Sequence, residues 1–176
     1  TQVVAHRGYW RAPGSAQNSI ASLCKADSID CYGSELDVWL STDGVLFVNH
    51  DAVFKGHNVE QSSSAELRAI ILDNGEHMPT LDEYLAKAKT LKTRIVLELK
   101  AHQTKEKEAE AVAKIVEMVE KYGWTDRTEY ISFSLFACKE FKRVAPQGTD
   151  IYYLNGELSP AELKTLGFAG FDYSMG

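Results

Sequence analysis

The chain has 176 residues, of which 44% are hydrophobic and 25% are charged, and its formal net charge is -6. These values are typical of one globular domain with a single core, and the negative charge argues against nucleic acid as a partner. No segment approaches the roughly 20 apolar residues of a transmembrane helix, so we expect a soluble chain. The compartment stays open: cytoplasmic, or periplasmic or secreted if a leader peptide has been removed. The three cysteines form no CxxC pair, which argues against a disulfide framework or a zinc site.

Hydrophobic period and turn signals divide the first half of the chain into short elements. One apolar run ends at His6-Arg7, a helix begins after a cap at Asn18 or Ser19, and a later strand ends at His50. In chain order we predict a strand over residues 3–5, a helix from residue 20, a strand over 33–40, a turn at 42–44, a strand over 45–49 and a polar loop over 54–61.

The second half alternates between strands and helices. Ser63 with Glu66, and Thr80 with Glu83, have the spacing of capping boxes and predict two short helices. We further predict strands over residues 94–99, 129–133, 151–154 and 168–173, and helices over 105–122, over 135–144 and from about residue 160.

Strands that alternate with helices favour mainly parallel pairing, and seven strand signals in this rhythm predict an α/β fold of the TIM-type (β/α)8 barrel class. Such a barrel usually needs roughly 250 residues. We therefore interpret residues 1–176 as a single domain that is truncated after its seventh strand, with its C-terminal end missing.

Charged side chains occur inside two of the predicted strands. Because side chains alternate between the faces of a strand, Glu35 and Asp37 share one face, and Glu98 and Lys100 share one face opposite the neighbouring leucines. In a barrel the aliphatic face lies against helices, so we expect these four charges to point inward, near the C-terminal strand ends that carry barrel active sites.

Three inward carboxylates and one lysine leave negative charge uncompensated. Because a buried carboxylate is costly unless it is paired or binds a metal, we predict a divalent ion, Mg²⁺ or Ca²⁺, at Glu35, Asp37 and Glu98. An edge pair of acids facing water and a simple Glu98–Lys100 ion pair are the structural alternatives.

Two histidines also follow strands. His6 and His50 are suited to proton transfer near neutral pH, and Arg7 offers a planar donor group for phosphate. A single histidine at a strand end is more often structural, but the combination of these groups at successive strand ends favours cleavage of a phosphodiester.

These residues resemble the glycerophosphodiester phosphodiesterase family, within the PI-phospholipase-C-like phosphodiesterase superfamily. The similarity extends over essentially the whole chain. It is carried by Ala5-His6-Arg7-Gly8, Gly33-Ser34-Glu35-Leu36-Asp37-Val38, Thr42-Asp43-Gly44, His50-Asp51, Pro79-Thr80-Leu81-Asp82-Glu83, Leu97-Glu98-Leu99-Lys100 and Ser132-Phe133.

The resemblance implies roles for these side chains and a substrate. It implies metal ligands at Glu35, Asp37 and Glu98, an acid–base pair at His6 and His50, phosphate contacts from Arg7 and Lys100, and supporting positions at Asn18 and Asp51. It further implies metal-dependent hydrolysis of a small glycerophosphodiester to glycerol 3-phosphate and an alcohol.

The sequence departs from the family pattern at Gln17, and it leaves two rival functions open. Gln17 stands where the family commonly has glutamate, so one charge near the site is lost, whereas Asn18 is kept. The rivals are a non-catalytic barrel that binds phosphodiesters or a partner protein, and a phospholipase that acts on intact phospholipid head groups. Survival of both histidines argues against the first rival, and the lack of a long apolar loop argues against the second. The sequence does not predict an oligomeric state.

Overall fold

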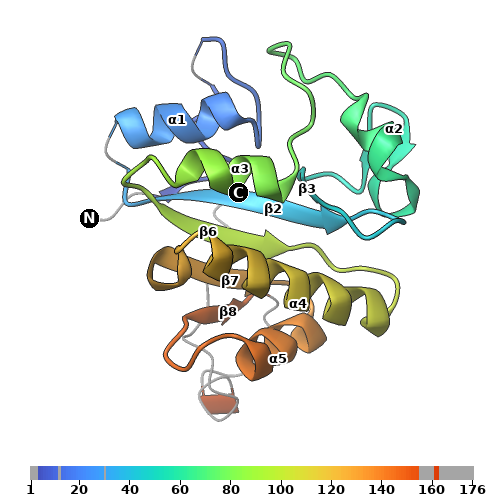
Figure 1. The fold of residues 1–176 in the computed structure, drawn as a ribbon, viewed down its shortest axis with the longest axis vertical. Coiled ribbons are helices and arrows are strands. Elements are labelled where there is room, and N and C mark those ends of the chain that lie inside the picture. The colour runs from blue at the N-terminus through green and yellow to red at the C-terminus, as the bar shows by residue number, and fades with distance from the viewer. Residues whose placement is uncertain (1–3, 12, 30, 155–160, 163–176) are drawn as a thin grey trace.

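The computed structural model describes residues 4–11, 13–29, 31–154 and 161–162 (Figure 1). Its elements are β1 (Val4–Ala5), α1 (Ile20–Ser28), β2 (Gly33–Leu40), β3 (Leu46–Val48), β4 (Val53–Phe54), β5 (His57–Asn58), η1 (Val59–Gln61), α2 (Ser64–Arg68), α3 (Leu81–Ala88), β6 (Arg94–Leu99), α4 (Lys105–Lys121), η2 (Thr125–Arg127), β7 (Thr128–Ser132), α5 (Leu135–Val144) and β8 (Ile151–Tyr153).

The main sheet has six strands within these residues, and five of them form a parallel series in the order β1-β2-β6-β7-β8. The expected mainly parallel pairing is therefore confirmed. Helices α1, α4 and α5 contact the strands of this series, and the sheet does not close on itself within the described part of the chain.

Strand β3 departs from the expected parallel series. It pairs antiparallel with the end of β2, with Val38 opposite Val48 and Leu40 opposite Leu46. The prediction that residues 45–49 form one of the strands of the barrel series is therefore wrong. Only a short turn separates β2 from β3, whereas a parallel crossover needs about a dozen residues or more, so the chain must reverse direction.

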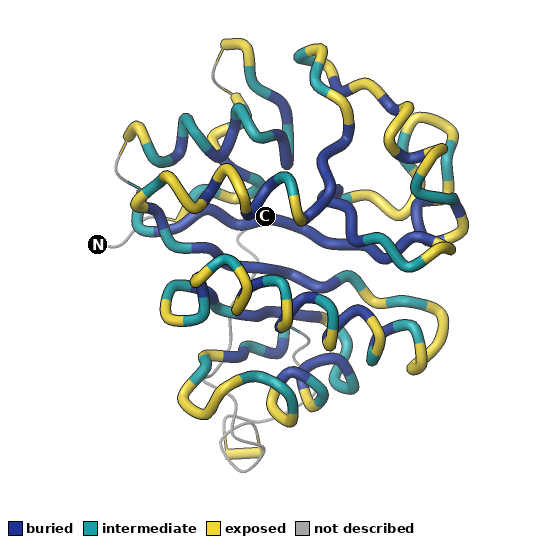
Figure 2. The backbone as a smooth tube through the Cα atoms, viewed as in Figure 1, coloured by how far each residue is buried: buried dark blue, intermediate teal, exposed yellow. Residues whose placement is uncertain are grey.

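The main core lies between the sheet and the helices. Leu36 and Val38 of β2 and Leu97 and Leu99 of β6 are fully buried against this layer, as the alternation of the sequence predicts. Figure 2 shows that β2 and β6 are buried along nearly their whole lengths. Because both faces of these strands are covered, the polar residues on the second face are also removed from water.

Most element boundaries agree with the predictions. Both capping boxes form, at Ser63–Glu66 and at Thr80–Glu83. The predicted polar loop over 54–61 instead contains β5 and η1, and β7 begins one residue before the predicted strand. The predicted strand over 168–173 lies outside the described residues. No described helix has both the length and the apolar character needed to cross a membrane.

Candidate active site

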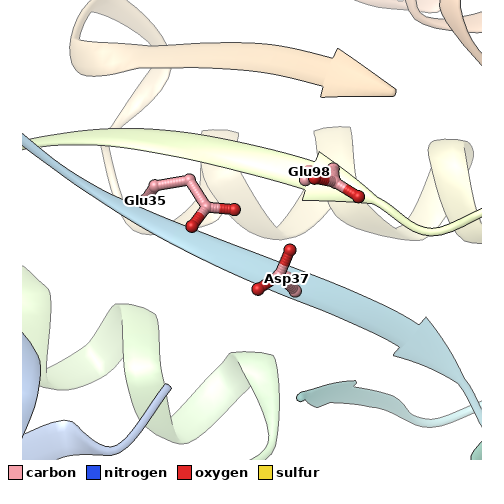
Figure 3. Close-up of side chains that lie close together, drawn as sticks. All are labelled: Glu35, Asp37 and Glu98. Atoms are coloured by element: carbon pink, nitrogen blue, oxygen red, sulfur yellow. The ribbon is translucent and has the colours of Figure 1, made fainter. Parts of the chain in front are cut away.

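Three acidic side chains converge on the face of the sheet opposite the main core. The register places Asp37 of β2 beside Glu98 of β6, and Glu35 lies two residues earlier on β2. Glu35, Asp37 and Glu98 are 5%, 0% and 6% exposed. One carboxylate oxygen from each residue lies within 4.8 Å of the other two (Figure 3). The alternative of an edge pair facing water is excluded by this burial.

Lys100 is the cation that accompanies this cluster. Its Nζ lies 2.8 Å from Glu98 Oε2 and 3.4 Å from Asp37 Oδ1. The ammonium group therefore bridges two carboxylates, one on each strand, and leaves Glu35 outside the ion pair. The simple Glu98–Lys100 pair considered from the sequence is one part of a larger charge cluster.

The cluster shifts the pKa values of Glu35, Glu98 and Lys100. Burial and the Asp37 carboxylate raise the pKa of Glu98 to about 7. The same two causes raise the pKa of Glu35 well above its ordinary value. Burial alone would lower the pKa of Lys100, but Asp37 and Glu98 outweigh it and raise that pKa, so the ammonium group stays charged. Close carboxylates cannot all ionise cheaply without further positive charge.

The arrangement fits a divalent cation. Among the described residues, no group donates a hydrogen bond to the buried Glu35 Oε1, and the carboxylates of Asp37 and Glu98 lie close to that of Glu35. Carboxylate oxygens are hard ligands of the kind that Mg²⁺ and Ca²⁺ prefer. An ion held by these three residues would give Glu35 Oε1 a partner. It would also compensate the excess negative charge of the three carboxylates.

The loop after β1 brings His6 and Arg7 to the same cluster. The Arg7 backbone N–H donates to Glu35 Oε2 at 2.9 Å, and His6 Nε2 lies 3.7 Å from the same oxygen. Arg7 and Gly8 both adopt positive φ angles, of 57° and 75°. A Cβ atom at Gly8 would lie 2.3 Å from Ser22 Oγ, so only glycine fits this close approach to α1.

The side chain of Arg7 binds two uncharged acceptors. Its Nη1 donates to Gln17 Oε1 at 2.8 Å, and its Nη2 contacts His50 Nε2 at 2.8 Å. The Nε atom of Arg7 is buried and has no hydrogen-bond partner within the part of the chain that the structure describes. Gln17, which from the sequence indicates only the loss of one charge, is thus a direct partner of Arg7. Because neither partner carries negative charge, the guanidinium remains an attractive site for an anion.

His50 reaches the cluster through the β2–β3 hairpin. Because β3 runs back along β2, the residue after it returns toward Asp37, and the Asn49 N–H donates to Asp37 O at 2.9 Å. His50 Nδ1 lies 2.9 Å from Asp51 Oδ1, and the rings of His6 and His50 have centroids 6.4 Å apart. The two histidines therefore lie on the same side of the carboxylate cluster as Arg7.

His6 and Asn18 complete the contacts around the cluster. Partial burial and the Arg7 guanidinium lower the pKa of His6, which favours the neutral imidazole. Asn18 Nδ2 donates to Asp37 Oδ2 at 3.0 Å, and Asn18 Oδ1 accepts from the Asp37 backbone N–H at 3.2 Å. This buried asparagine fixes both the backbone and the carboxylate of Asp37.

The structure joins all nine residues singled out from the sequence into one network of contacts. They are His6, Arg7, Asn18, Glu35, Asp37, His50, Asp51, Glu98 and Lys100, and the bond from the Asn18 N–H to Arg7 O joins their two halves. Sequence reasoning did not find Glu76, whose carboxylate reaches the first turn of α1 from 55 residues away. No local pattern around Glu76 marks this contact, because its partners are backbone N–H groups.

A cavity of about 540 Å³ opens beside His50. Trp10, Asp51, Phe54 and Asp73 are among its lining residues, so its wall combines aromatic rings with carboxylates. Gln17, the partner of Arg7, also lines this cavity. The cavity offers space for a small organic group next to the imidazole.

Known proteins resemble this chain in sequence and in fold. The family model described as the glycerophosphoryl diester phosphodiesterase family matches residues 6–163. A glycerophosphodiester phosphodiesterase from Caldanaerobacter subterraneus subsp. tengcongensis is 26% identical over 163 residues, a match that covers 83% of this chain. The chain spans 63% of the length of that curated relative.

Solved structures show the same fold. A crystal structure of a glycerophosphodiester phosphodiesterase from Parabacteroides distasonis ATCC 8503 is 51% identical with a TM-score of 0.95, and the match covers 98% of this chain and 72% of that one. An Oleispira antarctica phosphodiesterase, in complex with the product sn-glycerol-3-phosphate, is 27% identical with a TM-score of 0.81, over 97% of this chain and 74% of that one. These relatives are TIM barrels, which confirms the predicted fold class. The chain therefore belongs to the glycerophosphoryl diester phosphodiesterase family.

Proposed function

We propose that this chain forms the catalytic site of a metal-dependent phosphodiesterase that cleaves glycerophosphodiesters to glycerol 3-phosphate and an alcohol. One observation carries the proposal: three buried carboxylates, Glu35, Asp37 and Glu98, converge next to an arginine and two histidines. The product bound to the Oleispira antarctica phosphodiesterase supports glycerol 3-phosphate as the product here.

The cations of the site suit the phosphate group. Arg7 holds a guanidinium with a free, buried Nε and two neutral partners, so it can turn donors toward phosphoryl oxygens without losing an ion pair. Lys100 adds a second positive charge beside Glu98. Charge on the phosphoryl oxygens grows during cleavage, and fixed cations in a site sheltered from water stabilise it. A divalent ion at the three carboxylates would supply Lewis acidity to the same centre.

The two histidines suit the proton transfers. A hydroxyl that attacks phosphorus must lose a proton, and the departing alcohol must gain one. His6 and His50 lie on the same side of the cluster, with ring centroids 6.4 Å apart, so one can take the first proton while the other gives the second. Asp51 accepts from one nitrogen of His50 and would stabilise the imidazolium when His50 is protonated. The cavity beside His50 provides room for the alcohol part of the substrate.

The proposal is tested by incubating the full-length protein with glycerophosphocholine or glycerophosphoethanolamine and measuring release of glycerol 3-phosphate. We expect turnover with Mg²⁺ or Ca²⁺ and none after chelation, with activity restored by added ion. Binding of the substrates without hydrolysis would instead support the non-catalytic barrel. Preference for intact phosphatidylcholine vesicles over glycerophosphocholine would support the phospholipase.

A further inference from the structure

The first turn of α1 is fastened by a carboxylate from a distant loop. Glu76 Oε2 accepts from the Ile20 N–H at 3.1 Å, and Glu76 Oε1 accepts from the Ala21 N–H at 3.2 Å. The N-cap residue Ser19 accepts the next N–H, from Ser22, at 3.0 Å. The N-terminal N–H groups of a helix have no partner within the helix, so these three bonds satisfy most of them and place a negative charge at the positive end of the helix.

The turn that Glu76 fastens also supports Asp37. Asn18 directly precedes the cap of α1, and its side chain makes two hydrogen bonds to Asp37. Asn18 has a φ of 54°, a left-handed conformation that is adopted at a cost and persists only where neighbouring contacts enforce it. The position of the Asp37 carboxylate therefore depends on where α1 begins.

The same turn holds the loop that carries Arg7. The Asn18 N–H donates to Arg7 O at 3.0 Å, the Tyr9 N–H donates to Ser22 O at 3.0 Å, and Ser22 Oγ lies 3.2 Å from Arg7 O. Arg7 itself has a φ of 57° and binds Glu35 through its backbone N–H. One helical turn thus positions a proposed metal ligand and the proposed phosphate-binding arginine.

The loop that contains Glu76 reaches the cavity as well. The Glu76 N–H donates to Asn74 Oδ1, and Asn74 Nδ2 donates to Gly14 O, each at 3.2 Å. Leu72, whose N–H donates to Glu76 O at 2.7 Å, lines the cavity beside His50. This loop therefore ties the cavity wall to the start of α1.

From these contacts we infer that Glu76 is a positioning residue for the phosphodiesterase site. Within the described part of the chain its carboxylate binds the first turn of α1 and not the carboxylate cluster, so it acts through that turn on Asn18 and Arg7. The inference rests on the proposed function for its kinetic readout. Residues that orient metal ligands from the second layer typically change metal affinity or activity by about 10- to 100-fold when they are removed.

The test compares Glu76→Ala with a matched control, Glu66→Ala. Glu66 also caps a helix, because its Oε2 accepts from the Ser63 N–H at 3.0 Å at the start of α2, but among the described residues it contacts neither Asn18 nor Arg7. In the full-length protein we expect Glu76→Ala to weaken Mn²⁺ binding, measured by calorimetry, and to lower kcat/KM, each by about 10- to 100-fold. Glu76→Gln keeps one acceptor oxygen and should lose less. Glu66→Ala should lower only the melting temperature.

An NMR measurement gives a readout without metal or substrate. The side-chain amide resonance of Asn18 reports its bond to Asp37, and we expect it to shift in Glu76→Ala but not in Glu66→Ala. If Glu76→Ala only lowers the melting temperature, and leaves the Asn18 resonance, Mn²⁺ affinity and kcat/KM as in the wild type, the inference is overturned. Failure of the proposed function would show separately, as a wild-type protein that does not hydrolyse glycerophosphodiesters.

Discussion

The guanidinium of Arg7 donates a hydrogen bond to Nε2 of His50 across 2.8 Å. Arginine has only donors, so His50 Nε2 must carry the lone pair and Nδ1 the proton, which it donates to Asp51 Oδ1 at 2.9 Å. This contact fixes the tautomer of His50. In the proposed mechanism Nε2 of His50 exchanges a proton with substrate, so a phosphate that draws Arg7 away would free this nitrogen for that role.

Replacing His50 by alanine should reduce turnover strongly. Loss of a general acid or base typically costs about 10²–10⁴-fold in rate, so we expect kcat for glycerophosphocholine to fall within that range. The control is His57→Ala, because His57 lies on β5, outside the contact network of the site. Initial rates at saturating substrate and metal measure the effect. A reduction of less than about tenfold would contradict the proton-transfer role.

Replacing Arg7 by glutamine should weaken phosphate binding. A hydrogen bond to a charged group contributes about 1.5–3 kcal/mol, which corresponds to roughly 10- to 150-fold in an equilibrium constant. We therefore expect the inhibition constant of glycerol 3-phosphate to rise by that factor. Arg68→Gln is the control, since the Arg68 side chain is 56% exposed and pairs with Glu83. An unchanged inhibition constant in Arg7→Gln would remove Arg7 from the phosphate site.

The alternation of side chains made the inner face of the sheet predictable. In β2 and β6 the leucines were expected against helices and the charges on the opposite face, and Leu36 and Leu97 are indeed in the main core while Glu35 and Glu98 converge on the other side. This prediction needed only the two-residue period of a strand and the cost of burying charge.

Contacts that depend on tertiary geometry were not predictable in the same way. The short turn before β3 is compatible only with a reversal of the chain. The regular alternation of strands and helices nevertheless favoured a parallel strand there. The contacts of Arg7 with Gln17 and His50 depend on a left-handed backbone at Arg7, which its residue type does not favour. The contact from Glu76 to α1 joins side chain to backbone over a long sequence separation and leaves no pattern in the sequence.

Removing the charge of one carboxylate of the cluster should weaken metal binding. Asp37→Asn leaves the shape of the side chain nearly unchanged but removes its charge, so we expect Mn²⁺ affinity to fall by at least about 10-fold, the scale on which even supporting residues of metal sites act. Glu117→Gln, on the exposed face of α4, is the charge-matched control. Calorimetry of the chelated and dialysed protein provides the measurement. Equal affinities in the two variants would exclude Asp37 as a ligand.

The elevated pKa of Glu98 predicts how stability depends on pH when metal is absent. The folded-state pKa is about 7 and the ordinary value is 4.5, so between these pH values the folded chain binds more protons than the unfolded chain. The free energy of unfolding must then decrease as pH rises through this range. Glu35, whose pKa is also raised, adds to the same trend.

Urea denaturation of the chelated protein at about pH 5 and at about pH 8 measures this loss of folding stability. Glu98→Gln cannot ionise, so it should lose less stability between the two pH values than the wild type. Leu97→Ala, at the neighbouring fully buried position, should cost about 2–5 kcal/mol at both pH values and leave the pH dependence unchanged. Saturating Mg²⁺ or Ca²⁺ should restore the stability of the wild type at pH 8, because the ion binds the ionised carboxylates of the folded state. Stability that rises with pH in the chelated wild type, with no difference from Glu98→Gln, would show that Glu98 keeps an ordinary pKa and that the cluster does not need a cation.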